Sequence, residues 1–170
     1  MSNLSQNIAL LSGHIESLIN AQFKSQVTVN YKESQSISAT EFLTARTSLH
    51  GFYVLSNATE TMVLGFDRSI LIHLASQLLG CDSSAFLKQA DTLSLFEQFL
   101  EQEWVRAFKA ILDDLGLDFE IENQGESRKN IGFFMNYPQF YYAPFQLSWA
   151  DQGRGSFHLC YQTLSSRSQL

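Results

Sequence analysis

The sequence contains few cysteines, no basic leader and no long apolar run. Its two cysteines, Cys81 and Cys160, are too few for a disulfide-rich secreted scaffold and favour a reducing cytoplasm. The N-terminus lacks the basic and apolar regions of a signal peptide. No stretch approaches the roughly 20 consecutive apolar residues that a membrane-spanning helix needs. These absences predict a soluble, cytoplasmic protein with no direct membrane insertion.

Basic residues are also scarce. The chain has 11 lysines and arginines against 17 aspartates and glutamates, which gives a net charge of -6 and a pI of about 5.1. The basic residues are scattered along the chain. Proteins that bind the phosphate backbone of nucleic acids instead cluster such residues on one surface. We therefore expect no nucleic-acid partner.

The motifs of common enzyme classes are missing from the sequence. It has no Gly-x-Ser-x-Gly elbow, no phosphate-binding loop and no dinucleotide fingerprint, although a serine–histidine–aspartate set assembled by the fold stays open. His158 and Cys160 are two residues apart and are expected on one strand face, as a metal site would require. The other histidines and the other cysteine do not occur in closely spaced pairs, as metal ligands often do. They are His14, His50, His73 and Cys81. We expect neither a metal nor a cofactor.

Length and composition predict a single globular domain. The 170 residues are 45% hydrophobic and 16% charged, which is typical of a folded chain. A chain of this length buries roughly two thirds of its unfolded surface and needs no disulfide or metal to stabilise it. We place the domain at residues 1–165, followed by a short tail at 166–170.

Helices and strands are both predicted from the spacing of apolar residues. Steps of three and four indicate amphipathic helices, and alternation with a period of two indicates strands. Asp67 and Gly80 are expected to begin and end one helix, and Ser38 with Glu41 forms a capping pair for another. The helices are expected at 4–23, 39–46, 68–79 and 95–115. The strands are expected at 26–31, 52–56, 61–66, 117–122, 131–135, 141–149 and 155–162.

The segment from Met135 to Trp149 holds six aromatic residues and both prolines. Its odd-numbered residues from 141 are expected to share one apolar face, with the even-numbered residues on the other face. Residues 155–162 alternate in the same way, which predicts a hairpin with one face against the core. Pro138 and Pro144 cannot donate to a strand ladder, so each is expected at a strand start, a bulge or an edge.

A faint internal repeat divides the chain into two halves. Phe23–Ser34 and Leu115–Ser127 each follow an amphipathic helix, alternate as a strand and end in Glu-Ser. Val27 and Phe119 are equivalent in this comparison and lie 92 positions apart. Such an order is typical of a duplicated helix-plus-strands unit that shares one sheet.

The order of several segments resembles a known family. They are INAQFKSQVTVNYKESQSISATEFL, ETMVLGFDRSILIHLASQLLG, LSLFEQFLEQEWVRAFKAILDDL, NYPQF and GRGSFHLCYQTL. Together they resemble the middle domain of the FliM flagellar motor switch family, which is related to the CheC and CheX chemotaxis phosphatases. The resemblance covers about residues 1–165. It implies an α+β fold of the α/β/α kind, in which two pseudo-twofold units share a mainly antiparallel central sheet.

The same resemblance implies protein partners. Domains of this family contact FliG through a glycine-rich loop, which corresponds here to the segment after Leu79. Only Gly80 matches that pattern, and Ala85 is an apolar neighbour in the same segment. The expected partner-binding residues are Gly80, Cys81, Asp82, Phe86 and Leu87. FliG-like, FliN-like or CheY-like subunits and further copies of the chain are the expected partners, although the sequence ends at Leu170, before the β-rich domain that binds FliN in this family.

The related phosphatases carry a helical motif in which an acidic residue or serine is followed four residues later by a glutamate, and the glutamate is followed three residues later by an asparagine. In that family the asparagine orients the attacking water and the glutamate holds a lysine of the partner. The first helix here has Ser12 and Glu16 in the right spacing but Ile19 in place of the asparagine, and Asn20 lies about 100° further round the helix. We therefore expect a non-enzymatic assembly protein of a flagellar switch or a related type III secretion ring, with Glu16 as a solvated residue. A CheC/CheX-like phosphatase that uses Ser12 and Glu16, and a separate regulator that binds a signalling protein, remain the alternatives.

Overall fold

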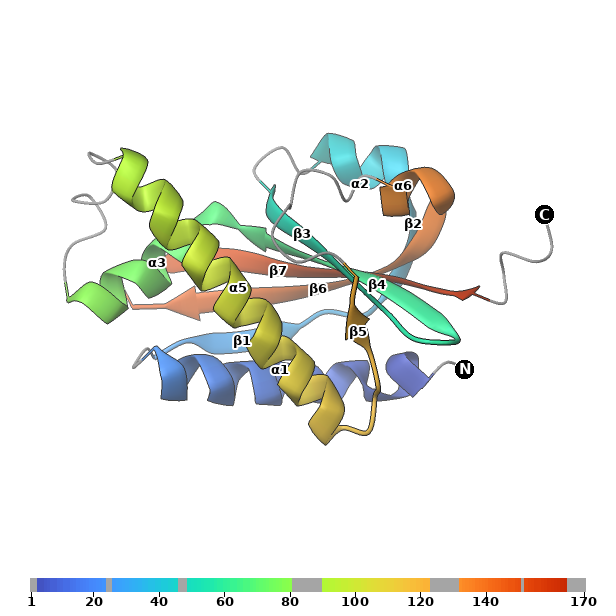
Figure 1. Cartoon of the computed structure of the whole chain (residues 1–170), viewed down its shortest axis with the longest axis horizontal. Coiled ribbons are helices and arrows are strands. Elements are labelled where there is room, and N and C mark those ends of the chain that lie inside the picture. The colour runs from blue at the N-terminus through green and yellow to red at the C-terminus, as the bar shows by residue number, and fades with distance from the viewer. Residues whose placement is uncertain are drawn as a thin grey trace.

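One sheet runs through the domain and carries helices on both of its faces (Figure 1). The computed structural model describes residues 3–23, 26–45, 49–80, 90–122, 132–150 and 152–164. The helices are α1 (Asn3–Gln22), α2 (Ala39–Ala45), α3 (Arg68–Leu79), α5 (Ala90–Asp114) and α6 (Gly132–Asn136). The strands are β1 (Thr28–Tyr31), β2 (Gln35–Ser38), β3 (Leu49–Ser56), β4 (Glu60–Asp67), β5 (Glu120–Ile121), β6 (Gln139–Trp149) and β7 (Gly153–Thr163).

The described strands form a seven-stranded sheet in the order β1-β6-β7-β4-β3-β5. Strand β2 pairs with β6 on the same side as β1, so that β1 and β2 together make one edge of the sheet. Every pairing is antiparallel. This arrangement confirms the predicted α+β class with an antiparallel central sheet.

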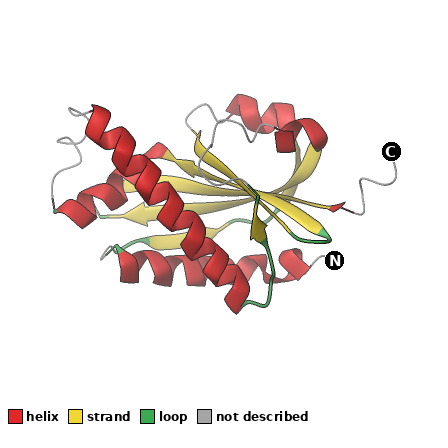
Figure 2. Ribbon diagram, in the orientation of Figure 1, coloured by secondary structure: helices red, strands yellow, loops and turns green. Residues whose placement is uncertain are grey.

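Helices lie on both faces of the sheet (Figure 2), and each face carries one hydrophobic cluster. The larger cluster joins α1, α3 and α5 to one face, and the smaller cluster joins α2 and α6 to the other. The prediction of a single buried face for the β6–β7 hairpin is therefore wrong: Tyr142 and Cys160, on the second face, are both 1% exposed. None of the described helices is long and apolar enough to cross a membrane.

The segment around residue 133 is a helix and not the predicted strand. Phe133, Phe134 and Tyr137 are all buried in the smaller cluster, and the Tyr137 N–H donates to the Phe133 carbonyl over 2.9 Å. Spacings of one and four residues place these rings on one side of a helical turn, a pattern that alternation with period two would not produce. Strand β2, which has only four residues, was not predicted from the sequence. The Ser38 cap is confirmed, because its hydroxyl accepts from the Glu41 N–H over 3.1 Å.

The two halves of the chain are related by an approximate twofold axis between β4 and β7. Exchanging β1 with β5, β6 with β3 and β7 with β4 reproduces the strand order in reverse. The register of the outer strands agrees: the pair Val29–Leu147 in β1 and β6 becomes, after a shift of 92 positions, the pair Ile121–Leu55 in β5 and β3. Phe42 in α2 and Phe134 in α6 are also 92 positions apart, and their rings stack with centroids 5.4 Å apart. The sequence repeat is therefore a structural duplication.

Helix α1 covers the outer edge formed by β1. Glu16 Oε2 accepts from the Val29 N–H over 2.8 Å, and the Asn20 side chain both accepts from the Val27 N–H and donates to its carbonyl, over 2.8 Å and 3.0 Å. These backbone groups point away from β6 and would otherwise be open to pairing with another strand. Glu16 is thus a structural clamp, and the prediction that it is a solvated residue is wrong.

Both prolines lie where the ladder needs no donor. Pro138 lies at a strand start, as predicted, whereas Pro144 lies within the central strand β6. Pro138 immediately precedes β6, and its carbonyl accepts from the Ala39 N–H over 2.9 Å. Pro144 lies opposite the break between β1 and β2, where its carbonyl accepts from the Lys32 N–H over 3.1 Å. Because the N and C=O of an antiparallel residue face the same neighbour, the missing N–H of Pro144 faces this break and no hydrogen bond to β7 is lost.

Two glycines of β7 allow α3 to lie close to the β6–β7 hairpin. A Cβ at Gly155 would come within 2.4 Å of Ile70 on α3, and a Cβ at Gly153 would overlap the indole of Trp149 on the paired strand. The indole in turn stacks on the imidazole of His73, with centroids 4.3 Å apart and planes 14° apart. Burial lowers the pKa of His73 below its ordinary value of 6.5.

Replacing Glu16 with alanine is expected to lower the free energy of unfolding by about 1–2 kcal/mol, because the Val29 N–H loses its acceptor. Glu16→Gln is the matched control: it retains an amide oxygen and should retain most of the stability. Urea denaturation followed by circular dichroism measures both variants. An alanine variant as stable as the wild type would show that the clamp does not contribute.

The free energy of unfolding is expected to decrease as the pH is lowered below about 6.5. In that window His73 is protonated more readily in the unfolded chain than in the folded chain, because burial lowers its pKa. The contribution is complete above the unfolded pKa and is lost as the pH falls towards the lower folded pKa. His73→Phe retains a ring to stack on Trp149 but cannot titrate. The loss of stability between about pH 7.5 and about pH 5 should therefore be smaller in this variant than in the wild type, as measured by thermal melts. Identical losses would contradict the assignment.

Candidate functional site

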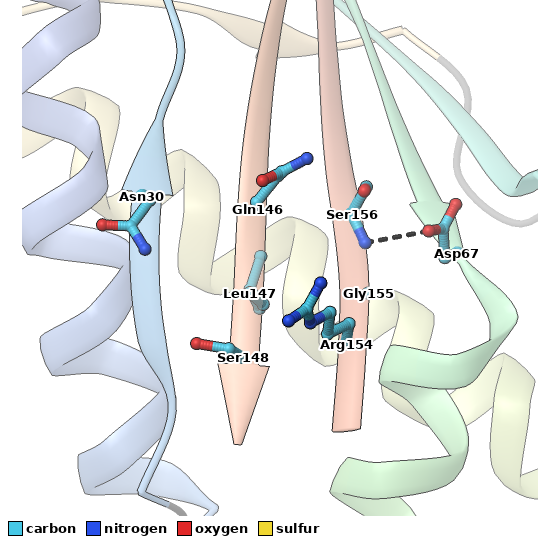
Figure 3. Close-up of a pocket in the computed structure, with 8 residues that line it drawn as sticks. All are labelled: Asn30, Asp67, Gln146, Leu147, Ser148, Arg154, Gly155 and Ser156. Atoms are coloured by element: carbon cyan, nitrogen blue, oxygen red, sulfur yellow. Dashed lines mark hydrogen bonds between the residues drawn. The ribbon is translucent and has the colours of Figure 1, made fainter. Parts of the chain in front are cut away.

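A polar pocket of about 430 Å³ opens on the sheet face that α2 and α6 cover in part (Figure 3). The side chains of Tyr142 and His158 on this face are buried, whereas Gln146 and Arg154, each four residues further along the same two strands, are exposed. The pocket therefore forms where the helical cover ends. Its lining residues are Asn30, Asp67, Gln146, Leu147, Ser148, Arg154, Gly155 and Ser156.

The strand register explains why these polar groups meet. Gln146 is the cross-strand partner of both Asn30 on β1 and Ser156 on β7, which makes one row across three strands. Ser148 and Arg154 are partners in the adjacent row. Alternation in β6 and β7 directs all five of these side chains to the same face. Their amides, hydroxyls and guanidinium form the polar surface of the pocket.

Asp67 connects the pocket to the core. Its Oδ2 accepts from the Ser156 N–H over 2.8 Å, and its Oδ1 lies 3.3 Å from His158 Nε2. His158 is 5% exposed, and its Nδ1 lies 2.7 Å from the hydroxyl of Tyr142. An N–H at Nε2 can donate to the Asp67 carboxylate, while Nδ1 and the Tyr142 hydroxyl form the second hydrogen bond. Buried polar groups on this path are thus paired from the core to the pocket wall.

The prediction that the Asp67 side chain caps α3 is wrong. It occupies the position before α3 in an extended conformation, with φ -74° and ψ 140°, but its carboxylate makes no capping hydrogen bond. The carboxylate instead joins β4 to β7 through Ser156 and His158, which are 89 and 91 positions away in the sequence. Local sequence could not reveal this role, because both partners come from the other half of the chain.

Arg154 has no carboxylate within ion-pair distance among the described residues. Its side chain is exposed, and the close-up shows it leaning over the gap between β6 and β7, while Asp67 lies beyond Ser156 on the other side of β7 (Figure 3). The two opposite charges therefore line one pocket without pairing to each other. The arrangement provides charges and hydrogen-bonding groups suited to recognising a ligand.

The predicted site residues lie elsewhere or outside the described ranges. Helix α1, which carries Ser12 and Glu16, packs on the face opposite the pocket. The Ser12 hydroxyl donates to the Ala9 carbonyl over 3.0 Å. Gly80 ends α3 in the left-handed conformation, with φ 62°, and its N–H donates to the Ser76 carbonyl. The remaining predicted partner-binding residues lie outside the described residues. They are Cys81, Asp82, Phe86 and Leu87.

The sequence analysis did not single out the pocket, although β6 contained a sign of it. On the second face of that strand, Phe140 and Tyr142 give way to Gln146 and Ser148, which marks the end of the helical cover. Arg154 was expected in a turn, whereas it lies within β7. His158 and Cys160, considered as metal ligands, are both buried, and the two nitrogens of His158 contact Tyr142 and Asp67. No group of three or more metal-ligating side chains occurs among the described residues.

No protein-family model and no curated protein matches the sequence. Solved structures match the fold across almost the whole chain. The FliM middle domain from H. pylori has a TM-score of 0.68 and 18% identity, over 99% of this chain and 96% of that chain. FliY from Thermotoga maritima has a TM-score of 0.64 and 9% identity, over 98% and 90%. CheX from Borrelia burgdorferi, in a complex with CheY, has a TM-score of 0.56 and 12% identity, over 91% and 96%.

The H. pylori FliM domain also matches in its complexes with FliG and with SpeE. Identities of 9% to 18% mean that the likeness lies in the three-dimensional arrangement and not in the residues of any one site. It agrees with the antiparallel sheet and the two helical layers described above. The chain therefore has the fold shared by the FliM middle domain, FliY and CheX, as the resemblance in its sequence predicts.

Proposed function

We propose that this protein is a non-enzymatic assembly component of a flagellar motor switch, or of a related type III secretion ring, in the cytoplasm. The observation that carries the proposal is the match to the FliM middle domain, which extends over 99% of this chain and 96% of that domain. A match of that extent, without a large insertion on either side, favours the same kind of role. Because one fold supports several functions, the proposal also needs support from the residues.

The residues of α1 at the positions of the phosphatase motif are engaged in structural contacts, which supports the assembly role. The carboxylate of Glu16 is engaged by the Val29 N–H, so the motif's acidic residue already stabilises the sheet edge. Ile19, in the place of the water-orienting asparagine, is 0% exposed and belongs to the core. Asn20, the nearest carboxamide, is hydrogen-bonded at both of its polar atoms to Val27. These contacts leave the motif without a group that can orient water.

The proposed partners are proteins of the FliG or CheY type. FliM of this fold was solved with FliG, and CheX with CheY. We propose that the segment from Gly80 to Leu87, which follows α3, contributes the contact, with Phe86 and Leu87 as its apolar residues. FliN-like subunits and self-association are further candidates for the same assembly.

A pull-down with the full chain against FliG-like and CheY-like proteins of the same organism tests the proposal. We expect one of them to be retained, and we expect the double variant Phe86→Asp with Leu87→Asp to weaken retention at least about tenfold, as for a central apolar contact. Leu10→Asp is the matched control, since Leu10 is 55% exposed on α1. Retention of neither protein would overturn the assembly role, and equal losses in both variants would overturn the assignment of the segment.

The second candidate is a CheX-like phosphatase, favoured by the similarity to CheX. Incubation of the chain with phosphorylated CheY distinguishes it from the assembly role. We expect phosphate release no faster than CheY achieves alone, because the helix lacks the water-orienting asparagine. Faster release that disappears in Glu16→Gln would instead establish the phosphatase and overturn the non-enzymatic assignment.

A further inference from the structure

We propose that the polar pocket between β1, β6, β7 and the end of β4 binds a free α-amino acid with a polar side chain. Arg154 would receive the carboxylate of the ligand and Asp67 its ammonium group. The inference does not depend on the assembly role. It rests on the separation of two opposite charges across one pocket, on the donors and acceptors between them, and on the pocket's size.

Arg154 is the only basic residue among those that line the pocket, and its guanidinium has no carboxylate partner among the described residues. Guanidinium presents two parallel N–H groups that match the two oxygens of a carboxylate. In a chain with a net charge of -6, an arginine that lies over a polar surface and pairs with no carboxylate in the described ranges is available to an anionic group. Its backbone is fixed, because its carbonyl accepts from the Ser69 hydroxyl over 3.3 Å.

Asp67 provides the opposite charge. Its side chain is 25% exposed and lines the pocket, so a ligand can reach it. Each of its oxygens has one protein contact, to the Ser156 N–H and to His158 Nε2. A carboxylate offers about four lone-pair positions, so two remain for the N–H groups of an ammonium. The same two contacts hold the carboxylate in place before a ligand arrives.

The rest of the lining defines the side chain of the ligand. Asn30 and Gln146 carry amides and Ser148 and Ser156 carry hydroxyls, each of which donates and accepts. Such groups favour an amide or hydroxyl side chain over an aliphatic one, since an aliphatic group would leave them without partners. The volume of about 430 Å³ falls within the range of roughly 300–1,000 Å³ that small-molecule sites occupy.

The opposite charges of Arg154 and Asp67 favour a zwitterionic ligand over an anion or a cation. A phosphate or dicarboxylate would place its extra negative charge near Asp67, which is unfavourable. A cation would meet Arg154. A zwitterion satisfies both ends at once, and it adds no net charge to the pocket.

Titration of the ¹⁵N-labelled full chain with L-glutamine tests the proposal by NMR. We expect amide shifts confined to residues around Asn30, Asp67 and 146–156. Two analogues remove one charged group each: glutaramate lacks the ammonium and 4-aminobutanamide lacks the carboxylate. Each should bind roughly ten- to a hundredfold more weakly, the usual loss for one charged hydrogen-bonding group.

Arg154→Gln and Asp67→Asn should weaken glutamine binding by a similar factor, and Arg106→Gln, which removes the same charge from the exposed face of α5, should not. A thermal melt establishes that Asp67→Asn remains folded, and Arg154→Gln carries the test if it does not. The proposal is overturned by the absence of pocket shifts at about 10 mM glutamine, a concentration that saturates a millimolar site. It is equally overturned by glutaramate binding as tightly as glutamine, which would mark a plain anion site.

Discussion

The pairing of β4 with β7 is the constraint on which the other strand pairs depend. Seven residues of each strand are in register, from Glu60 opposite Thr163 to Phe66 opposite Phe157. The strands come from different halves, so this pairing closes a long loop whose entropy must be offset by burial. Helices on both faces supply that burial: every residue of β4 before Asp67 is buried. Without the pairing, each half would present its central strand as an open edge.

The duplication places an equivalent set of polar residues in the other half of the sheet, and there they are hydrogen-bonded to one another. By strand pairing, Ser148–Arg154 corresponds to Ser56–Thr61, although Arg154 lies one position beyond the shift of 92, and Asn30 corresponds to Glu122. There the Ser56 hydroxyl contacts Thr61 at 3.2 Å and donates to the Glu122 carboxylate, so the polar groups satisfy one another. At the pocket end a long guanidinium replaces a hydroxyl and an amide replaces a carboxylate. The two ends of one scaffold have thus acquired different chemistry.

The pocket is connected to the aromatic cluster beneath α2 and α6. Phe42 packs edge-on against both Tyr142 and His158, with centroids 5.3 Å and 6.1 Å away. Phe42 and Tyr142 together orient the imidazole of His158, so that its Nε2 faces the carboxylate of Asp67. Hydrogen bonds in such a low-dielectric site resist reorientation, because breaking one would leave a buried group without a partner. A charge held in this way loses little freedom when a ligand binds.

The sequence by itself determined the three long helices and the central hairpins, because these depend on apolar spacing within a few residues. The likeness of two segments 92 positions apart indicated the twofold repeat. Helix α6 was read as a strand, since its five residues are stabilised by Phe42 and Phe140 from other elements. Glu16 and Asp67 were misassigned for the same reason: their partners lie 13 to 91 positions away. Only the tertiary structure brought Arg154 and Asp67 to one pocket, because β4 and β7 come from distant segments of the chain and their pairing decides which of their side chains lie side by side.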